Sequence, residues 1–222
     1  MKVGVLFSGG KDSTLATFFA RRDGYEISCL ITIVSKNKDS FMFHTPSIGK
    51  TAMQAEAIGV PIVLEETDGE KEWELEDLKR AIKRARKEFG VEGIVSGAVE
   101  SVYQSSRIQK VCNELGVECF NPLWQKNQVE ILADLIDNKF EVIVVGAFAY
   151  PLDKSFLGKK IDKSFISEMK KLKSKWGISP AGEGGEYETF VLNCPFFERG
   201  LRVKSYKDIG ERNSWRREIV IY

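Results

Sequence analysis

The sequence predicts an α/β protein with a parallel sheet covered by helices, followed by a smaller C-terminal α+β domain. Short apolar runs alternate with helical patterns through residues 1–120, which is typical of parallel strands joined by crossover helices. A glycine-rich turn follows the first apolar run. The alternation then breaks at Asn121-Pro-Leu-Trp124. We therefore expect two domains, residues 1–121 and 122–222.

Five strands are expected in the first domain, at Val3–Phe7, Ile27–Val34, Pro61–Leu64, Ile94–Ser96 and Val117–Phe120. The helices expected between them are Asp12–Arg22, Pro46–Ile58, residues 75–89 and Tyr103–Leu115. The third helix has the clearest pattern, because its apolar side chains recur at steps of three or four residues. The last three helices end at Gly59, Gly90 and Gly116, the residue type that favours a helix C-terminus.

The second domain has a different pattern. Helical periodicity covers Gln128–Asp137 and the lysine-rich segment Asp162–Trp176. An apolar strand is expected at Glu141–Tyr150, and further strands run from a glycine-rich loop to the C-terminus.

The composition excludes several classes of protein. The 222 residues are 43% hydrophobic and 29% charged, as in globular proteins. A net charge of +1 does not suggest a dedicated nucleic-acid binder. No apolar run approaches the ~20 residues of a membrane span, and the N-terminus lacks the pattern of a signal peptide. We expect a cytoplasmic protein without a membrane partner.

The stretch FSGGKDST, Phe7–Thr14, has the properties of a phosphate-binding loop. It lies between the first strand and the first helix, where backbone N–H groups are unpaired and the helix dipole is positive. The glycines permit close approach of an anion, and the lysine adds a cation. It lacks the spacing of a Walker motif. The residues expected to hold phosphate are Ser8, Gly9, Gly10, Lys11, Asp12 and Ser13.

The motif SGGKDS resembles the PP-loop of the N-type ATP pyrophosphatases. The resemblance implies a Rossmann-like sheet of the adenine nucleotide α-hydrolase type that binds ATP and Mg²⁺, with Asp12 supporting the metal. It also implies cleavage of ATP to AMP and pyrophosphate. Such enzymes adenylate a carboxylate or a similar oxygen and then add a nitrogen or sulfur nucleophile. The alternative is an ordinary glycine turn with a helix cap.

The nitrogen source is expected to be ammonium or an amine on the substrate. The only histidine is His44, and the chain begins Met1-Lys2, so neither a Cys–His glutaminase nor an N-terminal nucleophile is fused here. His44 follows the second strand and could reach the phosphates, although a structural histidine is the alternative. The cysteines are scattered and contain no CxxC pair, unlike those of RNA thiolases or of zinc sites.

The stretch GEGGEYETF, Gly182–Phe190, places three carboxylates in a glycine-rich loop that leads into a strand. If residues 186–191 are extended, Glu186 and Glu188 share one face. Such acids suit Mg²⁺ or ammonium, and the alternative is a solvated hairpin.

Together with the PP-loop, the segments Gly97–Trp124 and Gly182–Phe197 resemble the diphthine–ammonia ligase family over the full chain. Members amidate diphthine, a modified histidine on translation elongation factor 2, to diphthamide. The resemblance implies nucleotide contacts at Gly97, Glu100, Tyr103 and Gln104. It implies catalytic roles for Lys11, Arg107, Glu183, Glu186 and Glu188. One departure is Asn193, where the family pattern suggests aspartate.

Two alternatives of function remain open from the sequence: a PP-loop ligase that modifies tRNA, and a nucleotide-binding sensor without turnover. The oligomeric state is also open between a monomer and a homodimer.

Overall fold

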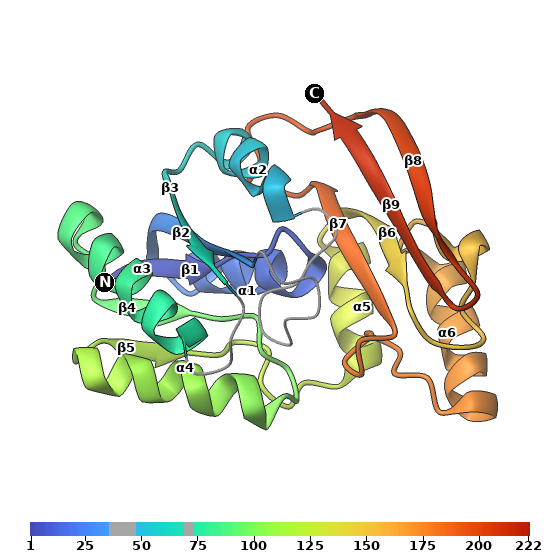
Figure 1. The fold of residues 1–222 in the computed structure, drawn as a ribbon, viewed down its shortest axis with the longest axis horizontal. Helices are drawn as coiled ribbons and strands as arrows, with labels where there is room; N and C mark the ends of the chain where they lie inside the picture. The colour runs from blue at the N-terminus through green and yellow to red at the C-terminus, as the bar shows by residue number, and fades with distance from the viewer. Residues whose placement is uncertain (36–47, 69–72) are drawn as a thin grey trace.

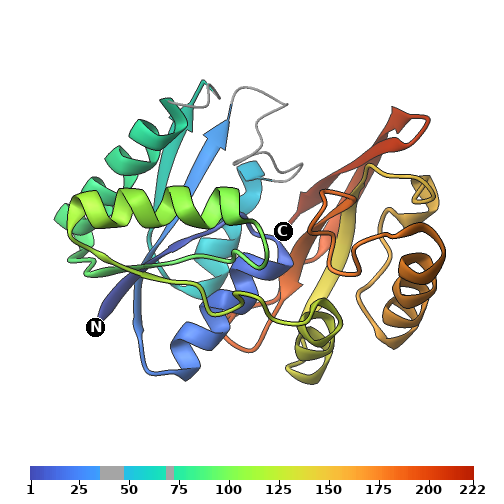
Figure 2. The same cartoon turned by 90° about the horizontal axis from the view of Figure 1, so that it is seen from below.

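The computed structural model describes residues 1–35, 48–68 and 73–222. It contains two sheets that lie side by side (Figures 1 and 2). The first is parallel, with strand order β3-β2-β1-β4-β5. Its strands are β1 (Lys2–Leu6), β2 (Glu26–Ser35), β3 (Ile62–Thr67), β4 (Gly93–Val95) and β5 (Glu118–Phe120). The predicted α/β class and Rossmann-like sheet are confirmed.

Helices cover both faces of this sheet. They are α1 (Lys11–Arg22), the short 3₁₀ turn η1 (Ile48–Lys50) with α2 (Thr51–Ile58), α3 (Trp73–Phe89) and α4 (Val102–Leu115). α3 and α4 pack on one face, and α1 and α2 pack on the other. β2 is therefore apolar on both sides: Ile31 faces α3 and α4, whereas Leu30 belongs to the cluster with α1.

The predicted ends of these helices are largely confirmed. Gly59, Gly90 and Gly116 have positive φ angles of 75°, 68° and 63°, the left-handed conformation that ends helices. The predicted start of the second helix at Pro46 lies outside the described residues.

The second sheet is antiparallel, with strand order β7-β6-β9-β8. Its strands are β6 (Glu141–Ala147), β7 (Tyr187–Asn193), β8 (Val203–Glu211) and β9 (Ser214–Ile221). The helices α5 (Gln128–Asp137) and α6 (Lys163–Trp176) accompany it, together with the turn η2 (Lys154–Phe156). The predicted strand Glu141–Tyr150 stops at Ala147, because its partner β7 begins at the residue paired with Ala147.

The two sheets share one hydrophobic core. A single cluster joins Val5 and Leu15 of the first half to Leu132, Val144 and Val191 of the second. Such continuity makes the two halves depend on each other for stability, and the boundary between residues 121 and 122 stays a prediction. None of the described helices is both long and apolar enough to cross a membrane.

Because the core is continuous, we expect one cooperative unfolding transition for both sheets. Leu132→Ala should lower the free energy of unfolding by about 2–5 kcal/mol, because the Leu132 side chain is fully buried and its truncation leaves a cavity. The matched change Leu64→Ala, at a side chain that is 44% exposed, should have a small effect. Calorimetry, with circular dichroism and tryptophan fluorescence, measures this. Two separate transitions would contradict the shared core.

Candidate active site

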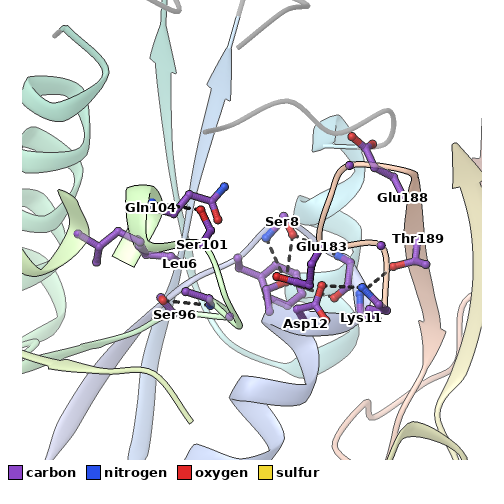
Figure 3. Close-up of a pocket in the computed structure, with 18 of the residues that line it drawn as sticks. Leu6, Ser8, Lys11, Asp12, Ser96, Ser101, Gln104, Glu183, Glu188 and Thr189 are labelled. Atoms are coloured by element: carbon purple, nitrogen blue, oxygen red, sulfur yellow. Dashed lines mark hydrogen bonds and ion pairs between the residues drawn. The ribbon is translucent and has the colours of Figure 1, made fainter. Parts of the chain in front are cut away.

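A cleft of about 680 Å³ lies at the carboxyl ends of β1 and β4. Strand order reverses at this point, since β2 lies on one side of β1 and β4 on the other, and ligands of open α/β sheets bind at such a point. Residues 182–185 and 187–189, from the second half of the chain, close one side of the cleft (Figure 3). The polar lining residues are Ser8, Lys11, Asp12, Ser13, Ser96, Ser101, Gln104, Glu183, Glu188 and Thr189.

The PP-loop turns between β1 and α1. Gly9 has φ +76°, which favours glycine. The Ser13 hydroxyl accepts a hydrogen bond from the Ser8 N–H at 3.2 Å, which folds the loop back on the helix. α1 begins at Lys11, and the residues of its first turn line the cleft. The positive end of the helix dipole therefore lies at the cleft, where it favours an anion.

Lys11 is a buried cation beside this loop. Its side chain is 5% exposed, and Nζ lies 2.8 Å from Asp12 Oδ2. Nζ also lies 5.5 Å from the ring centroid of Tyr187. A cation removed from water needs such partners, and in this position it adds positive charge next to the loop.

Glu183 brings a second carboxylate to Asp12. Figure 3 shows the two side chains next to each other, although they come from different halves of the chain. Burial, and then the charge of Asp12, raise the pKa of Glu183 to about 7, although Lys11 and the Glu100 backbone N–H oppose the rise. Asp12 Oδ1 is buried without a hydrogen-bond partner. Two close carboxylates, one with an unpaired oxygen, suit a divalent cation with oxygen ligands.

Glu188 lies in a different part of the cleft. Its side chain points away from Asp12 and Glu183 (Figure 3). Burial raises its pKa to about 8, opposed by the charges of Arg216 and Lys11. Its Oε2 atom is buried without a partner. At neutral pH this carboxyl therefore holds its proton, and it accepts or releases one close to pH 8.

Glu186 has a structural position. β7 begins at Tyr187, so Glu186 lies in the loop and not on the strand face predicted for it with Glu188. Its carboxylate accepts hydrogen bonds from the backbone N–H groups of Ser179 and Gly184, both at 2.8 Å. The side chain fixes the shape of the glutamate loop, residues 182–188, and is absent from the cleft lining.

The start of α4 forms the opposite wall. Tyr103 and Gln104 line the cleft, and the Ser101 hydroxyl caps the helix by accepting from the Gln104 N–H at 3.3 Å. Arg107 does not line the cleft, because its guanidinium lies over the Tyr103 ring at 4.1 Å.

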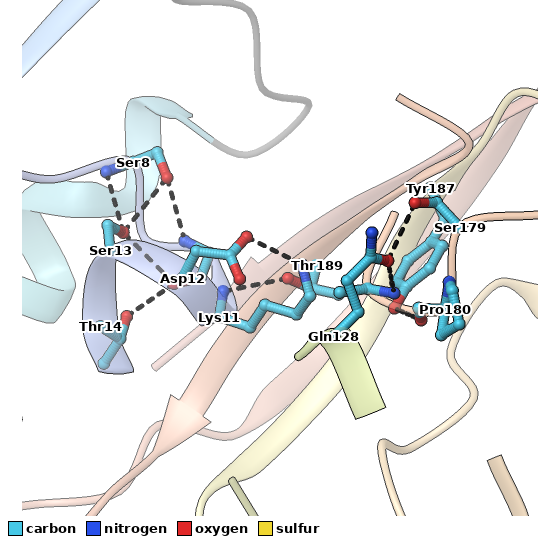
Figure 4. Close-up of polar contacts among 12 residues, drawn as sticks. Ser8, Lys11, Asp12, Ser13, Thr14, Gln128, Ser179, Pro180, Tyr187 and Thr189 are labelled. Carbon is cyan, nitrogen blue, oxygen red and sulfur yellow. Dashed lines mark hydrogen bonds and ion pairs between the residues drawn. The ribbon is translucent and has the colours of Figure 1, made fainter. Parts of the chain in front are cut away.

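Gln128 joins this wall to the segment that precedes the glutamate loop. Its Nε2 donates to the carboxylate of Glu100 at 3.0 Å, and its Oε1 accepts from the Ser179 hydroxyl and the Ala181 N–H. Figure 4 shows the side chain next to Ser179 and Pro180. Glu100 thus connects the two halves of the chain through Gln128. Its predicted contact with nucleotide stays a prediction.

Gly97 follows β4 and lies directly on the PP-loop. A Cβ atom at this position would lie 2.7 Å from the Ser13 nitrogen and 2.8 Å from the Asp12 carbonyl carbon. Gly97 therefore packs on the PP-loop itself, and its predicted contact with nucleotide stays a prediction. Glycine is required at this position by packing against the PP-loop, whether or not nucleotide also approaches it.

Sequence comparison assigns both halves of the chain to one family. Residues 1–119 match the diphthamide synthase N-terminal domain, and residues 127–220 match the diphthamide synthase C-terminal domain. The chain belongs to the diphthamide synthase family.

Curated relatives of this diphthamide synthase family member include diphthine–ammonia ligases. The protein from Bos taurus is 33% identical over 229 residues, which cover 92% of this chain and 84% of the relative. The protein from Homo sapiens is 32% identical with the same coverage. A solved structure from Methanocaldococcus jannaschii, described as a predicted subunit of a tRNA methyltransferase, has 21% identity and a TM-score of 0.46. The match covers 88% of this chain and 98% of the chain of that structure.

Sequence patterns did not indicate some site features of this diphthamide synthase family member. The apolar wall of the cleft comes from Leu6, Ile31, Ile33 and Ile108, which sequence patterns mark only as core. The four cysteines are scattered in the sequence, as described above, and the fold brings the thiols of Cys112 and Cys119 within hydrogen-bonding reach of each other. Neither lines the cleft. His44 lies outside the described residues.

We expect Gly97→Ala to displace the PP-loop, since its methyl group would collide with backbone atoms that have no free space. ATP affinity should fall at least tenfold, with a stability loss of about 1–3 kcal/mol. Gly49→Ala is the control, because no atom lies within 4 Å of its added methyl. Calorimetric titration with ATP measures the effect. Unchanged affinity in Gly97→Ala would show that the loop tolerates the shift.

Proposed function

We propose that this chain is an ATP-dependent ligase that amidates diphthine on translation elongation factor 2 with ammonium, releasing AMP and pyrophosphate. One observation carries the proposal: a PP-loop and a glutamate loop line a single cleft, in a chain whose two halves both match the diphthamide synthase domains. The relatives named diphthine–ammonia ligase support the same reaction. A cytoplasmic location suits an enzyme whose acceptor is a translation factor.

The cleft has separate regions for the parts of ATP. Leu6, Ile31 and Ile108 supply an apolar wall for the base. The PP-loop and Lys11 receive the β- and γ-phosphates, where the helix dipole and the buried cation favour negative charge. The α-phosphate then lies between the PP-loop and the glutamate loop, open to attack by the acceptor carboxylate.

Mg²⁺ fits the carboxylates on the phosphate side. Asp12 and Glu183 would hold it, since they lie together and Asp12 Oδ1 has no partner in the protein. When bound, the metal neutralises charge on the phosphates. Arg107 is the further cation proposed to offset charge as pyrophosphate leaves, moving from its place over Tyr103.

Glu188 serves the second half-reaction. The acceptor carboxylate becomes an acyl-adenylate, and the nitrogen of ammonia then forms a bond to its carbonyl carbon while the bond to AMP breaks. Ammonium must first lose a proton to become ammonia, and the nitrogen loses a second proton to water as the neutral amide forms. Glu188 lies away from the Asp12–Glu183 pair, and its carboxylate form can take the first of these protons. The form that accepts a proton predominates above a pH of about 8.

The products of ATP cleavage test the proposal. We expect the purified chain, with unamidated elongation factor 2, ATP and ammonium, to form AMP, pyrophosphate and an amidated factor. Mass measurement of the factor and chromatography of the nucleotides follow the reaction. ADP with phosphate would refute the PP-loop chemistry, and glutamine-dependent turnover would refute the nitrogen source. Modification of tRNA in place of the factor would establish the other ligase class.

The two glutamates should respond differently to loss of charge. Glu188→Gln should leave ATP affinity near normal and lower amide formation by roughly 10²–10⁴-fold, the range for loss of a general base. Glu186→Gln puts an amide against the N–H groups of Ser179 and Gly184. It should disturb the loop and lower thermal stability as well as activity.

The pH dependence separates these effects. Because the pKa of Glu188 is raised to about 8, the proton-accepting form increases as pH rises through that value. At a fixed concentration of ammonium ion, the rate of the unaltered enzyme should therefore rise from pH 6.5 to about 8 and then level off. The rate of Glu188→Gln, which depends on free ammonia, should be lower and should not level off near that pH. A rate of the unaltered enzyme that does not level off near pH 8 would exclude Glu188 as the base.

A further inference from the structure

Gln54 is a fully buried polar residue that contacts the PP-loop from behind. It lies in the middle of α2, with 0% of its surface exposed. Its Nε2 donates to the carbonyl oxygen of Gly9 at 3.0 Å and to that of Val191 at 2.8 Å. One side-chain amide thus joins the nucleotide loop to β7 of the second sheet.

The Gly9 carbonyl receives a second hydrogen bond from the same side. The Val191 N–H donates to it at 3.0 Å. A phosphate-binding loop must direct N–H groups toward the anion and carbonyl oxygens away from it. If the Gly9 carbonyl rotated toward the cleft, the Gln54 amide and the Val191 N–H would lose a partner inside the protein.

The other amide atom of Gln54 shows that packing alone does not explain this residue. Its Oε1 is buried without a hydrogen-bond partner, which costs free energy that an apolar side chain of similar shape would avoid. The same oxygen lies 2.1 Å from the position of a Cβ atom at Gly9. Gln54 therefore excludes every side chain at Gly9 and supplies the donor that fixes its carbonyl.

Further contacts extend this connection along β7. The Lys11 N–H donates to the Thr189 hydroxyl at 3.0 Å (Figure 4). α2 itself is tied to the second half, because the Glu198 N–H donates to the Ala57 carbonyl at 2.6 Å. β7 continues directly from the glutamate loop and carries Glu188. The loop that holds phosphate and the strand that holds the proposed base are thus joined at Gly9 and Lys11.

We propose that Gln54 is a positioning residue, which keeps the PP-loop in its anion-binding form and in register with Glu188 of β7. It acts through Gly9 and Val191 and touches no reacting atom. The role in amidation rests on the proposed function, whereas the role in ATP binding does not.

Gln54→Met tests the proposal, because methionine keeps the length of the side chain and removes the donor. Loss of two hydrogen bonds of ordinary strength should raise the KM for ATP about tenfold or more. The KM for ammonium should stay unchanged, since the Glu188 region is not contacted. The matched control is Gln109→Met, at an exposed glutamine of α4. Calorimetric titration with ATP, without acceptor, gives a readout independent of turnover.

Gln54→Glu supplies a second test through its pH profile. A neutral carboxyl can donate one hydrogen bond to Gly9 or Val191, whereas a carboxylate faces two carbonyl oxygens and repels them. ATP affinity of this variant, relative to the unaltered protein, should therefore fall as pH rises from 6 to 9. A purely structural role would change the melting temperature without that relative change in affinity.

The outcomes distinguish a positioning role of Gln54 from a purely structural one. Weaker ATP binding in Gln54→Met, together with the pH-dependent loss in Gln54→Glu, supports the proposal. A lower melting temperature with unchanged ATP affinity in both variants would overturn it. If the unaltered protein binds ATP but forms no amide, the proposed function fails, and the ATP titrations still decide the role of Gln54.

Discussion

An anion-binding loop is stable only if its carbonyl groups have partners on the side away from the anion. In this protein the second sheet supplies those partners. β7 donates to the Gly9 carbonyl through the Val191 N–H and accepts from the Lys11 N–H through Thr189. The PP-loop therefore completes its hydrogen bonding with a segment far along the chain, and the position of the whole second sheet relative to the nucleotide site follows from this constraint.

Charge is distributed in the cleft according to the same geometry. The buried Lys11 has Asp12 beside it, and Glu183 adds negative charge on that side. Glu188 is held apart, in a less polar region that favours its protonated form. Burial raises the pKa of both glutamates, but only the pKa of Glu183 is also raised by a neighbouring carboxylate. Two acids from one short motif thus acquire different chemistry from their surroundings.

The sequence was sufficient for the features that depend on local pattern. The parallel sheet, the amphipathic α3 and the PP-loop between β1 and α1 follow from periodicity, glycine placement and residue type. The neighbouring strands β1 and β4 were also expected, whereas the direct contact of Gly97 with the loop was not. These features need only the chain near each residue and the usual winding of parallel strands.

Features that depend on distant parts of the chain were not predictable. Gln54 lies inside an ordinary helical pattern, and nothing nearby indicates its contacts with Gly9 and Val191. The separation of Glu186 from Glu188 depends on whether a strand begins one residue earlier or later, which periodicity does not determine. The contact of Cys112 with Cys119 arises because a helix and the following strand pack side by side.

The bond between Lys11 and Thr189 spans 178 positions of the chain, and that between Gln54 and Val191 spans 137. During synthesis, the N-terminal half emerges long before its partner strand exists. The nucleotide loop consequently lacks these partners until β7 has been made. Contacts of such high sequence separation also carry a loop-closure cost. The PP-loop thus reaches its working shape long after its own residues are made, and a chain without β7 does not present a finished nucleotide site.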